Sequence, residues 1–153
     1  MIVKDEYSYL LQEAENIRNN KELLNKEYLV DFLLSEAKNK EREVKSLLIN
    51  CFLHMLKCEY QPEKTTRSWH MTILNCQTEL EFALEDEIAL FNKLNDVVSI
   101  CYDKARNRVS RETGLSINNF PKKCPWSLSE VIDENFINNF LDNHPLTNND
   151  TYY

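Results

Sequence analysis

Glycine occurs once in this chain of 153 residues, at Gly114, and proline occurs only four times. β-Sandwiches and barrels need many tight turns, and such turns draw heavily on glycine and proline. A chain that has so few of both is typical of long helices joined by short connections. The sequence therefore predicts an all-α fold, a single-domain helical bundle of about five or six helices with no sheet.

The length and composition agree with one soluble domain. Apolar residues make up 42% of the chain and charged residues 28%, which is ordinary for a globular protein that buries its own core. We expect a single helical domain over residues 1–142. A polar tail over residues 143–153, which contains Pro145, is expected to fray.

Apolar spacing predicts two helical runs before the first proline, at about 5–19 and 26–58. The second run contains six consecutive residues without an apolar side chain, between Ala37 and Val44. Either one long helix has its middle in solvent, or the run breaks into two helices. We favour the break, with segments at about 26–37 and 39–58. Pro62 then prevents simple continuation.

Three further helices are predicted after Pro62. The first starts at Thr65 or Thr66 as its N-cap and runs to about residue 84, with either Phe82 or Ala83 on its buried face. The second covers about 87–113, and Gly114 follows it as an expected left-handed C-cap. After an irregular loop at 115–126, a capping box of Ser127 and Glu130 opens a last helix that ends near 141.

The charge is negative overall but unevenly distributed. The net charge of -7 argues against non-specific binding to nucleic acid or to a membrane surface. Residues 104–123 nevertheless carry six bases and one acid, and residues 79–87 carry five acids and no base. A local anion site is one interpretation of the basic run. Solvated helix faces are the favoured interpretation of both runs.

The five cysteines indicate reduced thiols rather than a disulfide framework. Their number is odd, no two are spaced as CxxC, and Cys51, Cys76 and Cys101 fall on helix faces predicted to be buried. With neither a secretory signal nor a long apolar run in the sequence, we expect a cytoplasmic protein with no structural zinc site and no membrane association. No motif for a metal or for another cofactor is found, so none is predicted.

The first candidate site surrounds the residues that follow Pro62. Arg67, Ser68 and Trp69 lie in a predicted first helical turn, where free N–H groups and the helix dipole attract anions. An arginine and a hydroxyl beside them could complete a phosphate or carboxylate site. The favoured alternative is structural: Ser68 and Thr65 cap the helix, Trp69 enters the core and Arg67 pairs with a local acid such as Glu63.

A second candidate lies on the helix that ends at Gly114. Tyr102 and Arg106 are four residues apart and share one helix face, and Glu112 follows near the helix end. An arginine beside a buried stripe needs a fixed partner, which could be a carboxylate of the fold or a ligand. A structural ion pair is the favoured interpretation.

Two other residues that could carry chemistry have simpler structural interpretations. His54 is isolated on a largely apolar helix, where a core or boundary histidine is more common than a catalytic base. Cys124 precedes Pro125 and Trp126 in a loop, and a plug that packs Trp126 onto the bundle is favoured over a reactive thiol.

The order of several short motifs resembles a bacterial domain-of-unknown-function family, number twenty-nine. The resemblance extends from Tyr7 to about Phe136. It is carried by Tyr7–Ala14, His54–Lys57, Tyr60–Glu63, Arg67–Trp69, Thr72–Ile73, Tyr102, Ala105–Arg106, Glu112–Leu115, Phe120–Pro121, Cys124–Trp126 and Val131–Phe136. Cys58 departs from a tryptophan usual in that family, and Ala37 from a glycine. The resemblance implies an all-α bacterial cytoplasmic protein and no established activity.

Three functions remain as hypotheses. The favoured one is a non-catalytic protein-interaction module, in which Tyr60, Gln61, Arg67, Arg106 and Glu112 lock two connections together and an acidic surface meets a protein partner. The alternative is an anion-, nucleotide- or nucleic-acid-binding or processing protein, with Arg67, Ser68 and Arg106 in one pocket and Tyr60, Trp69 or Trp126 for stacking. The third is a toxin–antitoxin component or an inhibitor. The oligomeric state does not follow from the sequence.

Overall fold

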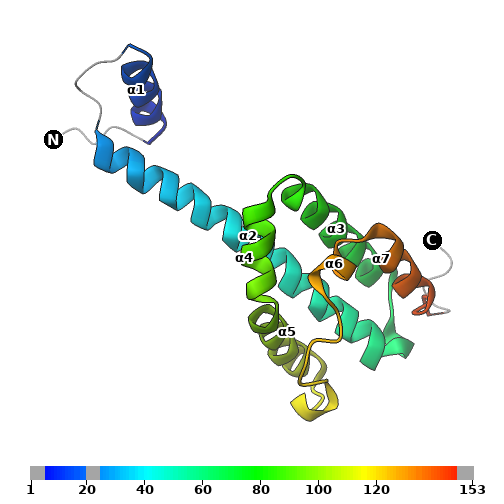
Figure 1. Ribbon diagram of the computed structural model, residues 1–153. Coiled ribbons are helices and arrows are strands. Elements are labelled where there is room, and N and C mark those ends of the chain that lie inside the picture. The colour runs from blue at the N-terminus through cyan, green and yellow to red at the C-terminus, as the bar shows by residue number, and fades with distance from the viewer. Residues whose placement is uncertain (1–5, 20–24, 148–153) are drawn as a thin grey trace. The chain divides into compact units, whose positions relative to one another are not determined.

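Every regular element among the described residues of the computed structural model, 6–19 and 25–147, is helical (Figure 1). The all-α prediction is therefore confirmed. The α-helices are α1 (Glu6–Arg18), α2 (Lys26–Tyr60), α3 (Arg67–Leu84), α4 (Ile88–Asp96), α5 (Val98–Thr113), α6 (Leu128–Val131) and α7 (Glu134–Asp142). Two short 3-10 helices, η1 (Pro62–Lys64) and η2 (Ile117–Asn119), lie in the connections.

The chain divides into two compact units, Met1–Asn39 and Lys40–Tyr153, and the boundary falls inside α2. The first unit holds α1 and the start of α2. Here the rings of Tyr9 and Tyr28 lie 4.0 Å apart between centroids, and the Asn25 N–H donates to the buried Glu13 carboxylate at 3.3 Å. These contacts join α1 to the beginning of α2.

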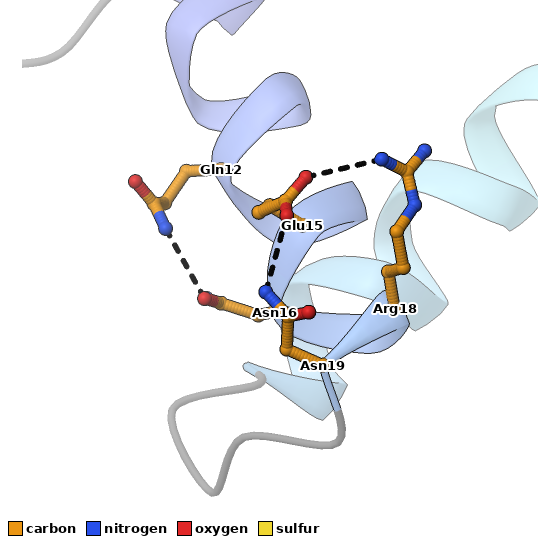
Figure 2. Close-up of polar contacts among 5 residues, drawn as sticks. All are labelled: Gln12, Glu15, Asn16, Arg18 and Asn19. Atoms are coloured by element: carbon orange, nitrogen blue, oxygen red, sulfur yellow. Dashed lines mark hydrogen bonds and ion pairs between the residues drawn. The ribbon is translucent and has the colours of Figure 1, made fainter.

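Polar side chains tie the last turns of α1 together (Figure 2). Gln12 donates to Asn16 at 3.1 Å, and Glu15 accepts from both Arg18 at 3.3 Å and Asn19 at 3.1 Å. Spacings of three and four residues place these side chains on neighbouring turns, where such pairs add a few tenths of a kcal/mol each, roughly 0.2–0.5. Arg18 in the last turn also suits the negative end of the helix dipole.

The predicted break in α2 is wrong, because the helix is continuous over its 35 residues. The segment without apolar side chains contains neither glycine nor proline, and its lysines, glutamates and arginine are good helix formers. Glu36 precedes Lys40 by four residues, and Glu41 precedes Lys45 by four, which is the favourable orientation for pairs on a helix. Apolar periodicity reports burial, and an exposed stretch of helix lacks it without being broken.

The predicted helix at 87–113 is also wrong in its continuity, since it is divided at Val97 into α4 and α5. Val97 has φ −114° and ψ 14°, and its N–H bonds to Leu94 in a tighter turn at 3.0 Å. Two adjacent β-branched residues, Val97 and Val98, weaken the helix at this point. The last predicted helix divides similarly, because the Asp133 side chain accepts the Asn135 N–H and starts α7 as a new N-cap.

The core of the second unit is built around Phe52 of α2. Its ring meets Tyr102 of α5 edge-on at 5.9 Å and stacks on Trp126 at 6.0 Å, and Trp126 in turn meets Phe140 of α7 at 5.9 Å. Trp126 is thus the plug that was expected from the loop sequence. Helices α3 and α7 run side by side against this core (Figure 1). The buried cysteines are Cys51, Cys58, Cys76 and Cys101, and all five cysteines are free thiols.

Residues 143–147 of the expected tail are bonded to the rest of the second unit. His70 Nε2 donates to the His144 carbonyl at 2.6 Å, and the Thr147 N–H donates to the Thr65 carbonyl at 3.1 Å. The His144 ring stacks on Phe140. Residues 148–153 lie outside the described part of the chain.

Gly114 adopts the left-handed conformation that was predicted for the end of α5, with φ 74° and ψ 2°. Nothing lies within 4 Å of a Cβ added at this position, so a side chain would meet only backbone strain. We expect Gly114→Ala to lower the free energy of unfolding by about 1–2 kcal/mol, and Gly114→Asn by less, because asparagine tolerates this conformation better. Urea unfolding of both variants tests this, and equal losses would contradict it.

Candidate functional site

Three segments that are far apart in the sequence meet in the second unit, and we call their meeting place the junction. They are the end of α2 (57–61), the start of α3 (66–69) and the end of α5 with its following loop (112–121). Lys57 contacts both of the other segments: its Nζ lies 2.8 Å from a Glu112 carboxylate oxygen and 5.4 Å from the centre of the Trp69 ring. An ion pair and a cation–π contact thus share one ammonium group.

Aromatic packing closes the junction on the side of the loop. The Tyr60 ring meets the buried Phe120 ring edge-on at 5.1 Å between centroids. The Tyr102 hydroxyl donates to the Pro121 carbonyl at 2.6 Å, and burial raises the pKa of Tyr102 to about 12. The phenol therefore stays protonated as a hydrogen-bond donor at neutral pH.

The Arg106 side chain binds backbone carbonyls of the loop that follows Gly114. Its guanidinium donates through Nε to the Phe120 carbonyl at 3.2 Å and through Nη2 to the Ile117 carbonyl at 2.9 Å. The predicted ion pair between Arg106 and a carboxylate is thus wrong, because two main-chain carbonyl oxygens accept its hydrogen bonds instead. A loop with an irregular backbone leaves carbonyl groups without partners, and a forked donor can satisfy two of them at once.

Arg67 and Ser68 are both exposed in the first turn of α3. The capping residue is Thr66, whose hydroxyl accepts the Trp69 N–H at 3.3 Å, so neither Ser68 nor Thr65 has that role. Gln61 is half-buried and its N–H donates to the Lys57 carbonyl at 2.8 Å. The structure thus joins Tyr60, Trp69, Tyr102, Arg106 and Glu112 into one connected cluster, and Arg67 and Ser68 lie on the surface beside it.

Sequence reasoning missed the central position of Lys57. A signal was present, because Lys57 stands among His54, Met55, Leu56 and Cys58 in a largely apolar stretch, and a cation there needs a partner. The adjacent His54 is half-buried and donates through Nδ1 to the Asn50 carbonyl at 2.9 Å. Burial lowers the pKa of His54, which favours the neutral ring. The contact with Asn50 and the partial burial of His54 therefore agree with a boundary histidine of the fold.

The hydrogen bond from Lys57 lowers the pKa of Glu112 below its ordinary value of 4.5. A carboxyl whose pKa is lower in the folded state stabilises the fold above its unfolded pKa, and that contribution is lost as the pH falls through the folded value. We expect Glu112→Gln to be less stable than the wild type at neutral pH, with a difference that shrinks below 4.5. Urea unfolding at about pH 7 and about pH 3 measures this. A difference that is equal at both pH values would contradict it.

No group of three or more histidine, cysteine or acidic side chains that could hold a metal occurs in the part of the chain that the structure describes. Over the same residues, no helix has both the length and the apolar character needed to cross a bilayer. The junction itself offers hydrogen bonds, aromatic surfaces and ion pairs, since Glu112 pairs with both Lys57 and Arg108. Tyr102 and Arg106 direct their donors at the protein's own backbone.

A family model described as "Domain of unknown function DUF29" matches residues 3–137, which is most of the chain. The chain belongs to the DUF29 family. The DUF29 match covers the whole junction, including the residues from Lys57 to Pro121. Searches of the curated proteins and of the solved structures return no match. The family confirms the resemblance found in the motifs, and its description assigns no activity.

The motifs of the resemblance to DUF29 coincide with the junction. Lys57, Tyr60, Arg106, Glu112 and Phe120 all belong to these motifs, and each makes one of the contacts described above. Cys58, where the resemblance leads us to expect tryptophan, is fully buried, and burial raises the pKa of its thiol to about 11. The position is thus part of the core in this chain.

Proposed function

We propose that this DUF29 chain is a small protein-interaction module without catalysis of its own, acting in the cytoplasm. The observation that carries the proposal is the use of the signature side chains inside the fold: Arg106 and Tyr102 bond to backbone carbonyls, and Lys57 pairs with Glu112. Side chains that are bonded in this way stabilise the fold. The five free thiols suit a reducing compartment.

Because these residues are used inside the fold, we expect the exposed surface of the second unit to bind the partner. Among the described residues of the second unit, four large apolar side chains are exposed, Met71, Phe82, Ile88 and Ile100, and Phe82 at 79% and Ile88 at 76% are the most exposed of them. Phe82 also lines two hollows in this surface. Scattered apolar side chains are normal on a surface, but an exposed aromatic side chain that lines such hollows is typical of a protein contact. This supports a partner protein over a small substrate.

Affinity capture tests the proposed function directly. The full chain, carrying a tag and expressed in its source organism at its natural level, should recover a protein that is absent from a tag-only control under at least one of several growth conditions. The complex should form again from the two purified components with a fixed stoichiometry. A chain that recovers no protein above the control under any of these conditions would contradict the proposal.

Anion or nucleotide binding is the second candidate, favoured only by Arg67 and Ser68 at the exposed start of α3. Arg106, which the sequence placed in the same pocket, already donates to two carbonyls. A ligand present at 100 times its dissociation constant would add about 2.7 kcal/mol to the free energy of unfolding. Thermal unfolding with inorganic phosphate and a panel of nucleotides should show no such shift. A clear shift that Arg67→Met removes would favour this second function instead.

A further inference from the structure

Phe82 stands between two hollows on the second unit. One hollow, of about 410 Å³, is lined by Thr78, Leu84 and Ile132, and the other, of about 310 Å³, by Val44, Ala83 and Leu90. Phe82 and Glu85 line both of them. We call Phe82 and these two hollows the Phe82 surface.

Internal contacts hold the floor of the Phe82 surface in place. The buried Gln77 of α3 donates to the Ile132 carbonyl at 2.9 Å, which fixes the wall of the larger hollow. Lys40 of α2 lies 3.8 Å from the Glu87 carboxylate at the edge of the smaller one. Asp86, in the connection between α3 and α4, adopts a positive φ of 58°. The backbone beside the hollows is therefore ordered before a partner binds, which lowers the entropy cost of binding.

The Phe82 surface is strongly acidic. Glu81 and Glu85 line the larger hollow, and Glu43, Glu85 and Glu87 line the smaller one. Lys40 is the one basic residue among those that line either hollow, and Glu87 pairs with it. Such a field attracts basic groups and repels nucleic acid and anionic lipid.

We propose that the Phe82 surface binds a lysine- or arginine-rich segment of a partner protein, whose apolar side chains enter the hollows on either side of Phe82. This inference rests on the proposed function and adds the place of contact and the chemistry of the partner. Apolar contact with Phe82 supplies most of the affinity, since exposed aromatic side chains dominate such interfaces. The glutamates supply speed of association and choice of partner.

The test places a photo-crosslinking phenylalanine analogue at position 82 of the full chain, in cells of the source organism. A second chain carries it at Ile100, an apolar residue of α5 that is 54% exposed and away from the hollows. We expect an adduct from position 82 and none from position 100. The crosslinked partner peptide should be rich in lysine or arginine and should carry apolar residues.

Binding of that peptide, synthesised and labelled, to the purified full chain completes the test. Phe82→Ala should weaken binding by at least about tenfold, and Ile100→Ala by less than twofold. Raising the salt from about 0.05 to 0.5 M should weaken binding by a similar factor, because exposed charges are screened. Glu81→Lys together with Glu85→Lys should act in the same direction.

Other outcomes overturn the inference in distinguishable ways. An adduct at position 100 alone, or a complex that Phe82→Ala leaves intact, would reject the Phe82 surface and leave the proposed function standing. An adduct to a second copy of the chain, or to residues 1–39 of the same chain, would replace the basic partner with self-contact. An acidic partner peptide would reject the assigned chemistry. Absence of any adduct together with failed affinity capture would reject the proposed function as well.

Discussion

Phe52→Ala is expected to lower the free energy of unfolding by about 3–5 kcal/mol, the range for removing a buried phenylalanine side chain. Phe52 is 0% exposed and packs against both Tyr102 and Trp126. Truncation removes its apolar contact and leaves a cavity between α2, α5 and the Trp126 loop. Urea unfolding followed by tryptophan fluorescence measures the loss, because both tryptophans lie in the second unit.

The chain provides a matched control for this truncation in Phe82. The same change, Phe82→Ala, removes a side chain that is 79% exposed and should alter the free energy of unfolding by less than about 0.5 kcal/mol. If Phe52→Ala does not fold, Phe52→Leu keeps the experiment informative, with an expected loss of about 1–2 kcal/mol. Similar losses for Phe52→Ala and Phe82→Ala would contradict the assigned core.

Arg106→Met is expected to lower the free energy of unfolding by about 2–3 kcal/mol. Methionine keeps most of the apolar length of the side chain and removes the donors to Ile117 and Phe120. Hydrogen bonds from a charged group contribute about 1.5–3 kcal/mol each, and partial exposure of Arg106 reduces their sum. Equilibrium unfolding gives the value, with Arg111→Met, an exposed arginine on the same helix, as the control.

The sign of the Arg106 effect separates two roles. A residue kept for a ligand is commonly held at a cost to stability, so its replacement leaves the fold unchanged or makes it more stable. A residue that satisfies backbone carbonyls makes the fold less stable when it is lost. A rise in stability for Arg106→Met would therefore return Arg106 to the list of ligand-binding candidates.

The features of the fold that the sequence predicted correctly are those that depend on local signals. Gly114 as a left-handed cap and the Ser127–Glu130 capping box depend on a few neighbouring residues, and both are present as predicted. The continuity of α2 and the division at Val97 were missed for opposite reasons. In α2 an exposed helical stretch lost its apolar pattern, whereas at Val97 the apolar pattern passed through a real interruption.

The candidate site was predictable in part only. Composition and the order of motifs pointed to Tyr60, Arg106 and Glu112, but their partners lie in other segments: Glu112 meets Lys57 across 55 positions of sequence. Such pairing depends on how helices pack, which no local pattern contains. The choice between Phe82 and Ala83 on the buried face also stayed open, because adjacent helix positions differ by about 100° and either one fits the stripe. The structure turns Phe82 outward.

The central claim is that the end of α2 and the loop after Gly114 form one packed junction, and the contact between Tyr60 and Phe120 tests it most directly. The measurement is the coupling free energy in a cycle of Tyr60→Leu, Phe120→Leu and the double variant, from urea unfolding. Edge-to-face aromatic pairs predict a favourable coupling of about 0.5–1.5 kcal/mol. Strictly additive losses, with no coupling, would mean that the two connections do not meet.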